Sequence, residues 1–119
     1  MDLAIAERTV GRVTVLDLAG RLTVDHGADR IKDKVNSLIA QGRTQIVLNL
    51  KDVPYIDSGG LGQLVASFGS VKKAAGSLKL LNVNSRNHDL LSITRLVTIF
   101  DSFDSESEAV QSFPALAHD

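Results

Sequence analysis

Cysteine is absent from the 119 residues of this chain, which excludes a disulfide framework and thiolate metal sites and fits a reducing compartment. An excess of one charge is also missing, because 13 Lys and Arg residues face 14 Asp and Glu residues and leave a formal net charge of -1. We therefore expect no basic field that would hold nucleic acid directly. A protein or a small molecule is the better expectation for a partner.

Long apolar runs are missing as well. The purely aliphatic runs extend over only a few residues, so we expect no membrane-spanning segment, and the first residues lack the features of a signal peptide. Internal repeats, linkers and low-complexity segments are also absent. We expect a soluble, cytoplasmic protein. A composition of 44% hydrophobic and 23% charged residues predicts a single domain over residues 1–119, with its core at about 3–113.

The stretch VPYIDSGGLG, residues 53–62, separates a buried strand from an amphipathic helix. Gln45 to Leu50 reads QIVLNL, a continuous aliphatic run that predicts a strand covered on both faces. Apolar residues then recur at helical spacing as a core-facing stripe: Leu61, Leu64, Val65, Phe68 and Val71. Lys72 and Lys73 in the last turn and Gly76 after it predict the end of this helix.

Ser58 is expected at the start of that helix. Asp57 and Ser58 are both good N-cap residues, and either side-chain oxygen can accept a free N–H of the first turn. Gly59, Gly60 and Gly62 follow, although each glycine costs about 1 kcal/mol in a helix interior. The glycines either permit a sharp strand-to-helix turn or let another molecule approach Ser58, and the two explanations are compatible. On spacing alone, Ser58 can also be an ordinary capping serine.

The residues before this stretch predict a hairpin and a helix. Apolar positions on either side of Gly11 indicate two strands, the second closed by Gly20. A helix follows with Asp25 as its N-cap and Gly42 as its stop. Its apolar face consists of Ala28, Ile31, Val35, Leu38 and Ile39.

The residues after it predict two strands and two helices. Residues 77–83 form a strand and residues 97–100 a short last strand. Between them a helix opens near Ser85, with apolar positions at Leu90, Leu91, Ile93 and Leu96. Ser105 and Glu108 have the spacing of a capping box and begin a final helix. The tail after Pro114 is expected to be frayed.

The predicted order is β-β-α-β-α-β-α-β-α. Strands that alternate with helices imply right-handed crossovers and a mostly parallel sheet, with an antiparallel edge strand from the hairpin. Sites in such sheets lie at the carboxyl ends of the strands. We therefore expect three loops to share one edge: Gly20 to Asp25, Asp52 to Ser58, and Asn82 to Arg86.

These residues resemble STAS domains, specifically bacterial anti-sigma-factor antagonists. The strings IVLNLKDVPYIDSGGLGQLV and VKKAAGSLKLLNV carry the resemblance, with Gly20 and the Leu90-Leu91 helix in support. It extends over about residues 3–113. It implies an α/β STAS fold, with a mostly parallel sheet of four to five strands, a β-hairpin start and about four helices.

The resemblance also implies a function. In the family, an anti-sigma factor that is a serine kinase phosphorylates the serine directly after the aspartate, here Ser58, and a serine phosphatase reverses the modification. Only the unphosphorylated form captures the anti-sigma factor and frees the sigma factor. This role needs no catalytic residue, cofactor or metal. The partner-binding residues that we predict are Asp57, Ser58, Gly59, Gly60, Leu61, Arg21, Thr23 and Asn84.

A phosphate at Ser58 would add a charge of about -1.5 to -2 beside Asp57. That charge would stand in a surface that must lose water on docking, and an unpaired buried charge costs several kcal/mol. Phosphorylation is therefore expected to weaken docking without unfolding the domain.

The chain departs from the family pattern at three places. Gly59 stands where Ser or Thr is common, which removes a second hydroxyl. The loop residues 20–23, GRLT, replace the usual G-E-x-D and put a cation in place of a carboxylate, which bears on the choice of partner. Arg95 in T-R-L replaces the glycine of T-G-L, so we expect that loop to adopt another conformation.

Four alternatives can be compared with this function. A serine hydrolase would need a strained elbow at Ser58, but Ile56 stands at the first glycine of G-x-S-x-G, although His26 could still approach as a base. Nucleotide binding has weak support because the glycine run lacks the lysine of a P-loop, and a metal site has weak support because His88 and His118 lack metal-ligand spacing. The fourth alternative is a constitutive STAS docking or ligand-sensing module in which Ser58 is only a helix cap.

Overall fold

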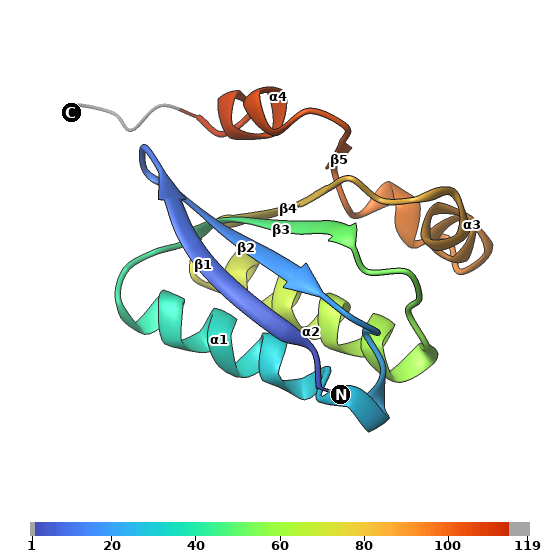
Figure 1. Ribbon diagram of the computed structural model, residues 1–119. Coiled ribbons are helices and arrows are strands. Elements are labelled where there is room, and N and C mark those ends of the chain that lie inside the picture. The colour runs from blue at the N-terminus through green and yellow to red at the C-terminus, as the bar shows by residue number, and fades with distance from the viewer. Residues whose placement is uncertain (1, 115–119) are drawn as a thin grey trace.

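The computed structural model describes residues 2–114, so the prediction for the tail after Pro114 lies outside the described residues. The predicted alternation of strands and helices is confirmed (Figure 1). In chain order the elements are β1 Ala4–Val10, β2 Val13–Ala19, the 3₁₀ turn η1 Val24–His26, α1 Asp29–Ala40, β3 Gln45–Asp52, α2 Ser58–Lys73, β4 Ser77–Leu81, α3 Ser85–Ile93, the 3₁₀ turn η2 Leu96–Thr98, β5 Ser102–Phe103 and α4 Glu106–Gln111.

The sheet has the order β1-β2-β3-β4-β5, so each strand lies beside its neighbour in sequence. β1 pairs with β2 in the antiparallel sense, and β2 to β5 run parallel. The mostly parallel sheet with an antiparallel edge strand is therefore confirmed. Because β2, β3 and β4 point the same way, the loops that follow them emerge at one edge.

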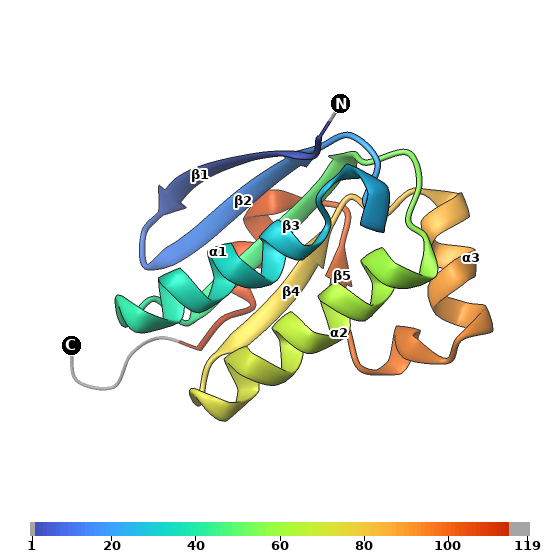
Figure 2. The ribbon, with the colours of Figure 1, turned by 90° about the horizontal axis from the view of Figure 1, so that it is seen from below.

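Helices cover the two faces of the sheet unequally. α1 and α2 lie side by side on one face and the short α4 covers part of the other (Figures 1 and 2). Side chains of β3 alternate between the faces: Ile46, Leu48 and Leu50 join the large core under α1 and α2, while Val47 joins the smaller core under α4. This double coverage explains the continuous aliphatic run of β3, because both faces of the strand are buried.

The predicted last strand at residues 97–100 is wrong. Leu96–Thr98 form the turn η2, and the strand that pairs with β4 is Ser102–Phe103. Leu96, Val97 and Phe100 all pack on the large core, and Phe100 meets Phe68 edge to face with ring centroids 5.3 Å apart. Apolar residues at i, i+1 and i+4 can reach one core only from a helical turn, because a strand would send neighbours to opposite faces.

Two helix ends also differ from the prediction. Asp25 lies in η1 and does not cap α1, whose N-cap position is held by Ala28 without a side-chain hydrogen bond. At the end of α2 the left-handed residue is Ala75, with φ 62°, and not Gly76. Gly76 has a different reason to be glycine, because a Cβ there would lie 2.2 Å from the carbonyl oxygen of Thr44. Close packing, not helix termination, requires the glycine.

Arg95 has φ 62° and ψ 19°, a left-handed conformation that glycine adopts at much lower cost than other residues. A difference between this loop and that of the family stays a prediction. In α2, Val65 is exposed, and Ser67 is buried in its place beside Leu64. The predicted capping box is confirmed, since the Ser105 hydroxyl accepts the N–H of Glu108 at 3.3 Å.

Among residues 2–114, no helix has the length and apolar character needed to cross a membrane.

Candidate functional site

The loops after β2 and β3 are joined through their backbones. The N–H of Leu22 donates to the carbonyl of Tyr55 at 2.9 Å, and the N–H of Asp57 donates to the carbonyl of Leu22 at 3.2 Å. These bonds flank an isolated parallel bridge between Leu22 and Ile56. The loop that carries Ser58 is therefore held in place by the loop after β2, as a short extension of the sheet.

The loop after β4 is tied to the same place. Asn84 caps α3, because its side-chain oxygen accepts the N–H of Asn87 at 2.8 Å. The amide groups of Asn84 and Asn87 both donate to the carbonyl of Val53, at 3.3 and 3.0 Å. The prediction that three loops share one edge is confirmed. Asn84 holds α3 against the Ser58 loop with the two polar atoms of its amide.

Asp57, and not Ser58, caps α2. The Asp57 carboxylate accepts the N–H of Gly60 at 2.7 Å through one oxygen and the N–H of Val24 at 3.3 Å through the other. Ser58 is the first helical residue and is exposed. Within residues 2–114 its hydroxyl makes no hydrogen bond, so the interpretation of Ser58 as a capping serine is wrong.

Two of the three glycines are required by internal packing. A Cβ at Gly59 would lie 1.9 Å from the Val24 side chain, and a Cβ at Gly60 would lie 1.9 Å from the carbonyl oxygen of Leu22. A Cβ at Gly62 would meet nothing within 4 Å. The first two glycines therefore let α2 pack directly on the loop after β2. Gly62 alone leaves open space for another molecule.

Ser58 lines a cavity of about 330 Å³ between its own loop and α3. The cavity is lined by Tyr55, Ile56, Asp57, Ser58, Arg86, Asn87, Asp89, Leu90 and Ile93. Tyr55 and Arg86 also line a neighbouring cavity of about 380 Å³, together with Arg21 and Pro54. The Arg86 guanidinium carbon lies 4.6 Å from the centroid of the Tyr55 ring, within the range of a cation–π contact. Arg86 and Tyr55 thus line both cavities.

Exposed apolar side chains gather around Ser58. Val24, Tyr55 and Ile93 are 65%, 37% and 79% exposed, and they are three of the five large apolar side chains exposed within residues 2–114. Val24 lies against Gly59, and the other two line the Ser58 cavity. Apolar surface of this kind, bordered by charged residues, is typical of protein docking sites.

The predicted partner-binding residues differ in accessibility. Ser58 and Arg21 are exposed, whereas Gly60 and Leu61 are buried. Thr23 is only 6% exposed, and its hydroxyl lies 2.8 Å from Nδ1 of His26. Gly60, Leu61 and Thr23 can shape the surface but offer a partner little contact area. Partner binding by the set stays a prediction.

Sequence reasoning placed Val24 and Arg86 only within loops that share this edge, and it did not single out these two residues or Ile93 as parts of the site. A lone apolar residue between Thr23 and Asp25 was the available signal for Val24, because a solvated loop has no reason to carry one. Ile93 fits the helical spacing of α3, so its exposure is visible only in the fold. Arg86 can be recognised as a site residue only from the fold, because it reaches the site through the packing of α3 on the Ser58 loop.

The hydrolase alternative finds no support in the geometry. Nδ1 of His26 is engaged by the Thr23 hydroxyl. His26 lines a cavity of about 510 Å³ with Asp2, Ala4, Ala19, Gly20 and Arg21, and Ser58 is not among the lining residues. Within the described residues, His26 is therefore not placed as a base for Ser58.

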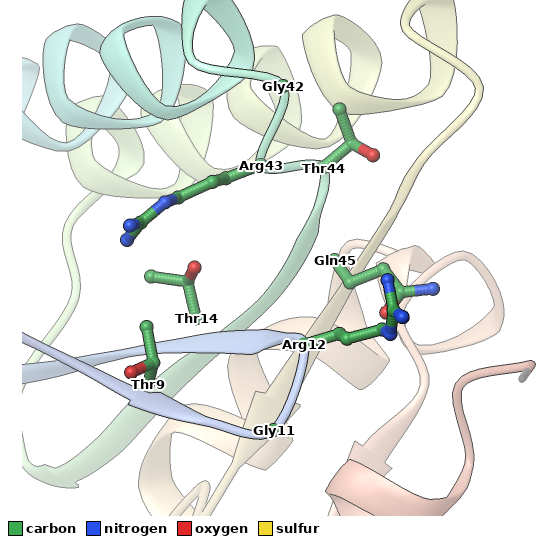
Figure 3. A pocket seen from close by; sticks show the side chains of 8 residues that line it. All are labelled: Thr9, Gly11, Arg12, Thr14, Gly42, Arg43, Thr44 and Gln45. Atoms are coloured by element: carbon green, nitrogen blue, oxygen red, sulfur yellow. The ribbon is translucent and has the colours of Figure 1, made fainter. Parts of the chain in front are cut away.

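A polar cavity of about 410 Å³ lies at the opposite, amino ends of β2 and β3 (Figure 3). The hairpin turn and the loop before β3 supply its lining, namely Thr9, Gly11, Arg12, Thr14, Gly42, Arg43, Thr44 and Gln45. Arg43 is already paired with Glu7 at 3.0 Å. This cavity is remote from Ser58, and the sequence analysis did not single it out.

The STAS domain family model matches residues 4–109, which include every loop of the Ser58 site. The chain belongs to the STAS domain family. It is similar to the anti-sigma-B factor antagonist of Bacillus subtilis strain 168, with 40% identity over 96 residues, covering 81% of this chain and 86% of the relative. It is also similar to the anti-sigma F factor antagonist of Paenibacillus polymyxa, with 28% identity over 92% of this chain and 94% of the relative.

Solved structures agree with this membership. The phosphorylated form of the Bacillus cell fate determinant SpoIIAA superposes with a TM-score of 0.71 at 26% identity, covering 91% of this chain and 97% of the other. A structure of the unphosphorylated SpoIIAA gives a TM-score of 0.70 over 91% and 96%. The STAS fold expected from the sequence is confirmed.

Proposed function

We propose that this chain is an anti-sigma-factor antagonist that docks on an anti-sigma factor through the surface around Ser58 and is released when Ser58 is phosphorylated. One observation carries the proposal. The Ser58 hydroxyl is exposed, is not used as a cap, and lies among the exposed side chains of Val24, Tyr55 and Ile93. A modifying enzyme can reach this hydroxyl, and a docking partner must cover it.

The similar proteins support this function. Two relatives are named as antagonists of anti-sigma factors, and SpoIIAA is known in phosphorylated and unphosphorylated forms. The proposal treats residues 3–113 as one STAS domain that acts in the cytoplasm, binds protein and does not act as an enzyme. Its partners are an anti-sigma factor with serine kinase activity and a serine phosphatase.

Ser58 is the substrate of the phosphoryl transfer. Its hydroxyl oxygen forms a bond to the γ-phosphorus of ATP held by the kinase, and the bond from that phosphorus to the bridging oxygen breaks. ADP leaves, and a base of the kinase takes the hydroxyl proton. The phosphatase restores the hydroxyl by hydrolysis, with water as co-reactant and inorganic phosphate as product.

The added charge is what ends the docking. A phosphate at Ser58 brings a charge of about -1.5 to -2 into a cavity that Asp57 and Asp89 already line. On docking, this cavity would lose water, and a charge that is buried there without full compensation costs on the order of 3–5 kcal/mol. Asp57 keeps its capping bonds in either state, so the fold itself is retained.

The proposal is tested by incubating the chain with ATP and the candidate anti-sigma kinases of its host, followed by intact-mass measurement and site mapping. Ser58→Ala is the test variant. Ser85→Ala is a matched control, because Ser85 is also an exposed first helical residue that follows a capping side chain, Asn84. We expect one phosphate in wild type and in Ser85→Ala, and none in Ser58→Ala.

Binding is measured in parallel by titration calorimetry with each candidate partner. We expect the unmodified chain to bind and the modified chain to lose at least about a hundredfold in affinity, the equivalent of about 2.7 kcal/mol. Tight binding without any modification of Ser58 would instead establish a constitutive docking module. Absence of both binding and modification would overturn the proposal.

A further inference from the structure

Arg86 is the one cation that lines the Ser58 cavity within residues 2–114. It lies in the first turn of α3, is exposed, and rests over the Tyr55 ring at 4.6 Å from the centroid. Within the described part of the chain its guanidinium has no carboxylate partner. A cation that is held over an aromatic ring and lines the same cavity as Ser58 is placed to respond to a new negative charge there.

We infer that Arg86 binds the phosphate of phosphorylated Ser58 and leaves Tyr55 in doing so. The inference rests on the proposed modification of Ser58. A guanidinium presents paired N–H donors that match two phosphate oxygens, and such charge-assisted, paired hydrogen bonds are stronger than a cation–π contact at an exposed site. The phosphate therefore outcompetes the ring for Arg86.

The other charged groups around the cavity make Arg86 the necessary counter-ion. Asp57 and Asp89 line the cavity and repel a phosphate. Next to Ser58, η1 presents the apolar Val24 to Gly59. His26 on the same turn lines a different cavity and is held by Thr23. Asp25, the acidic residue of η1, carries the same sign as the phosphate.

The consequence is a second effect of phosphorylation on the docking surface. Tyr55 lines both cavities, and the Arg86 guanidinium lies over its ring. When Arg86 turns to the phosphate, the ring loses its cover and the neighbouring cavity keeps only Arg21 as its cation. A partner that presents carboxylates to the Arg21 and Arg86 pair would then lose one of its two contacts. Phosphorylation changes the shape and charge of the surface beyond Ser58 itself.

The test uses the full chain with phosphoserine inserted at position 58 during translation, so that no kinase is needed. The pKa of the second phosphate ionisation is measured by phosphorus NMR in four proteins: wild type, Arg86→Gln, Arg86→Lys and Arg21→Gln. Arg21 is the matched control, because it is exposed and lines only the neighbouring cavity next to Tyr55. Circular dichroism verifies that each variant is folded.

We expect Arg86→Gln to raise the phosphate pKa by about 0.5 to 1, because a nearby cation favours the dianion. Arg86→Lys should raise it less, since lysine keeps the charge and loses the paired donors. Arg21→Gln should leave it within about 0.2 of wild type. An equal phosphate pKa in wild type and Arg86→Gln would overturn the inference.

Tyr55 supplies a second readout, because the chain contains one tyrosine and no tryptophan. Its fluorescence should change between the serine and phosphoserine forms of wild type and of Arg21→Gln. It should not change between the two forms of Arg86→Gln. A change that persists in Arg86→Gln would contradict the movement of Arg86. These outcomes do not depend on a cellular kinase, so they separate this inference from the proposed function, which fails if no kinase modifies Ser58.

Discussion

A Cβ at residue 60 would lie 1.9 Å from the carbonyl oxygen of Leu22, closer than any real contact of that kind. Gly60 therefore lets helix α2 begin directly against the loop after β2. The same Leu22 carbonyl accepts the N–H of Asp57. One backbone atom of the β2 loop thus fixes both the capping residue and the first turn that carries Ser58. The position of Ser58 depends on this contact.

Gly60→Ala is expected to lower the free energy of unfolding by at least about 2 kcal/mol, because the backbone of Leu22 cannot yield without breaking its hydrogen bonds. Urea denaturation measures the change. Gly62→Ala is the control, since its Cβ would meet nothing within 4 Å. That variant should gain up to about 1 kcal/mol from better helix propensity. Equal stability of the two variants would contradict the packing role of Gly60.

Gly62→Ala also separates the two explanations of the glycine run. If Gly62 provides close approach for a partner, its methyl group should weaken binding of the anti-sigma factor by about tenfold or more while the fold becomes more stable. Calorimetric titration of the unphosphorylated chain measures this. Unchanged affinity would mean that no partner atom approaches Gly62, and that the run is explained by internal packing at Gly59 and Gly60.

Asp57→Ala is expected to cost about 0.5–2 kcal/mol of stability, because it removes the acceptor of the Gly60 N–H. Ser58→Ala should change the stability by less than about 0.5 kcal/mol, since the serine hydroxyl caps nothing. Thermal and urea unfolding of the two variants give the comparison. A larger loss of stability in Ser58→Ala than in Asp57→Ala would show that the serine, and not the aspartate, caps the helix.

Ala75→Gly is expected to stabilise the chain by about 0.5–1 kcal/mol, because alanine at φ 62° is strained and glycine is not. Gly42 holds the equivalent left-handed position after α1, with φ 79°. Gly42→Ala is therefore the reverse substitution at an equivalent position, and it should lower the free energy of unfolding by about 1 kcal/mol. Opposite signs for the two variants in urea denaturation would verify the assignment. A loss in Ala75→Gly would refute it.

Arg8 links β1 to β2 and α4, and it makes the stability of the fold depend on pH. Its guanidinium donates to Asp17 at 2.7 Å and to Glu106 at 2.9 Å, which holds the pKa of both carboxyl groups below the usual range. A lowered folded-state pKa contributes stability that is present above the unfolded value, near 4, and is lost as pH falls through the folded value.

Arg8→Gln should therefore lose stability at pH 7, and the loss should shrink as the pH falls toward 2 and the two carboxyl groups become protonated. Because Asp17 and Glu106 are more than a third exposed, we expect a loss of about 1 kcal/mol or less at pH 7. Urea denaturation from pH 7 down to pH 2 measures the difference between the two proteins. A difference that does not shrink toward pH 2 would show that Arg8 acts by packing instead of charge.

The amino-acid sequence by itself determined the order of the elements, the parallel sheet and the edge at which Ser58 lies. These follow from local chemistry: the aliphatic run of β3, the helical spacing of Leu61, Leu64 and Val71, and turn residues such as Gly20 and Gly42. Spacing also placed Ser105 correctly as a cap. Such features are read from neighbours in the chain, and each segment carries its own signal.

The tertiary structure decided what depends on contacts between distant residues. Asp57, and not Ser58, caps the helix because its carboxylate accepts the N–H of Gly60 and also the N–H of Val24, a residue 33 positions away in the chain. Gly59 and Gly60 are glycines because the loop after β2 lies against them. Arg86 belongs to the site because α3 packs on the Ser58 loop. No local pattern encodes these three facts, since each depends on which atoms the folded backbone brings together.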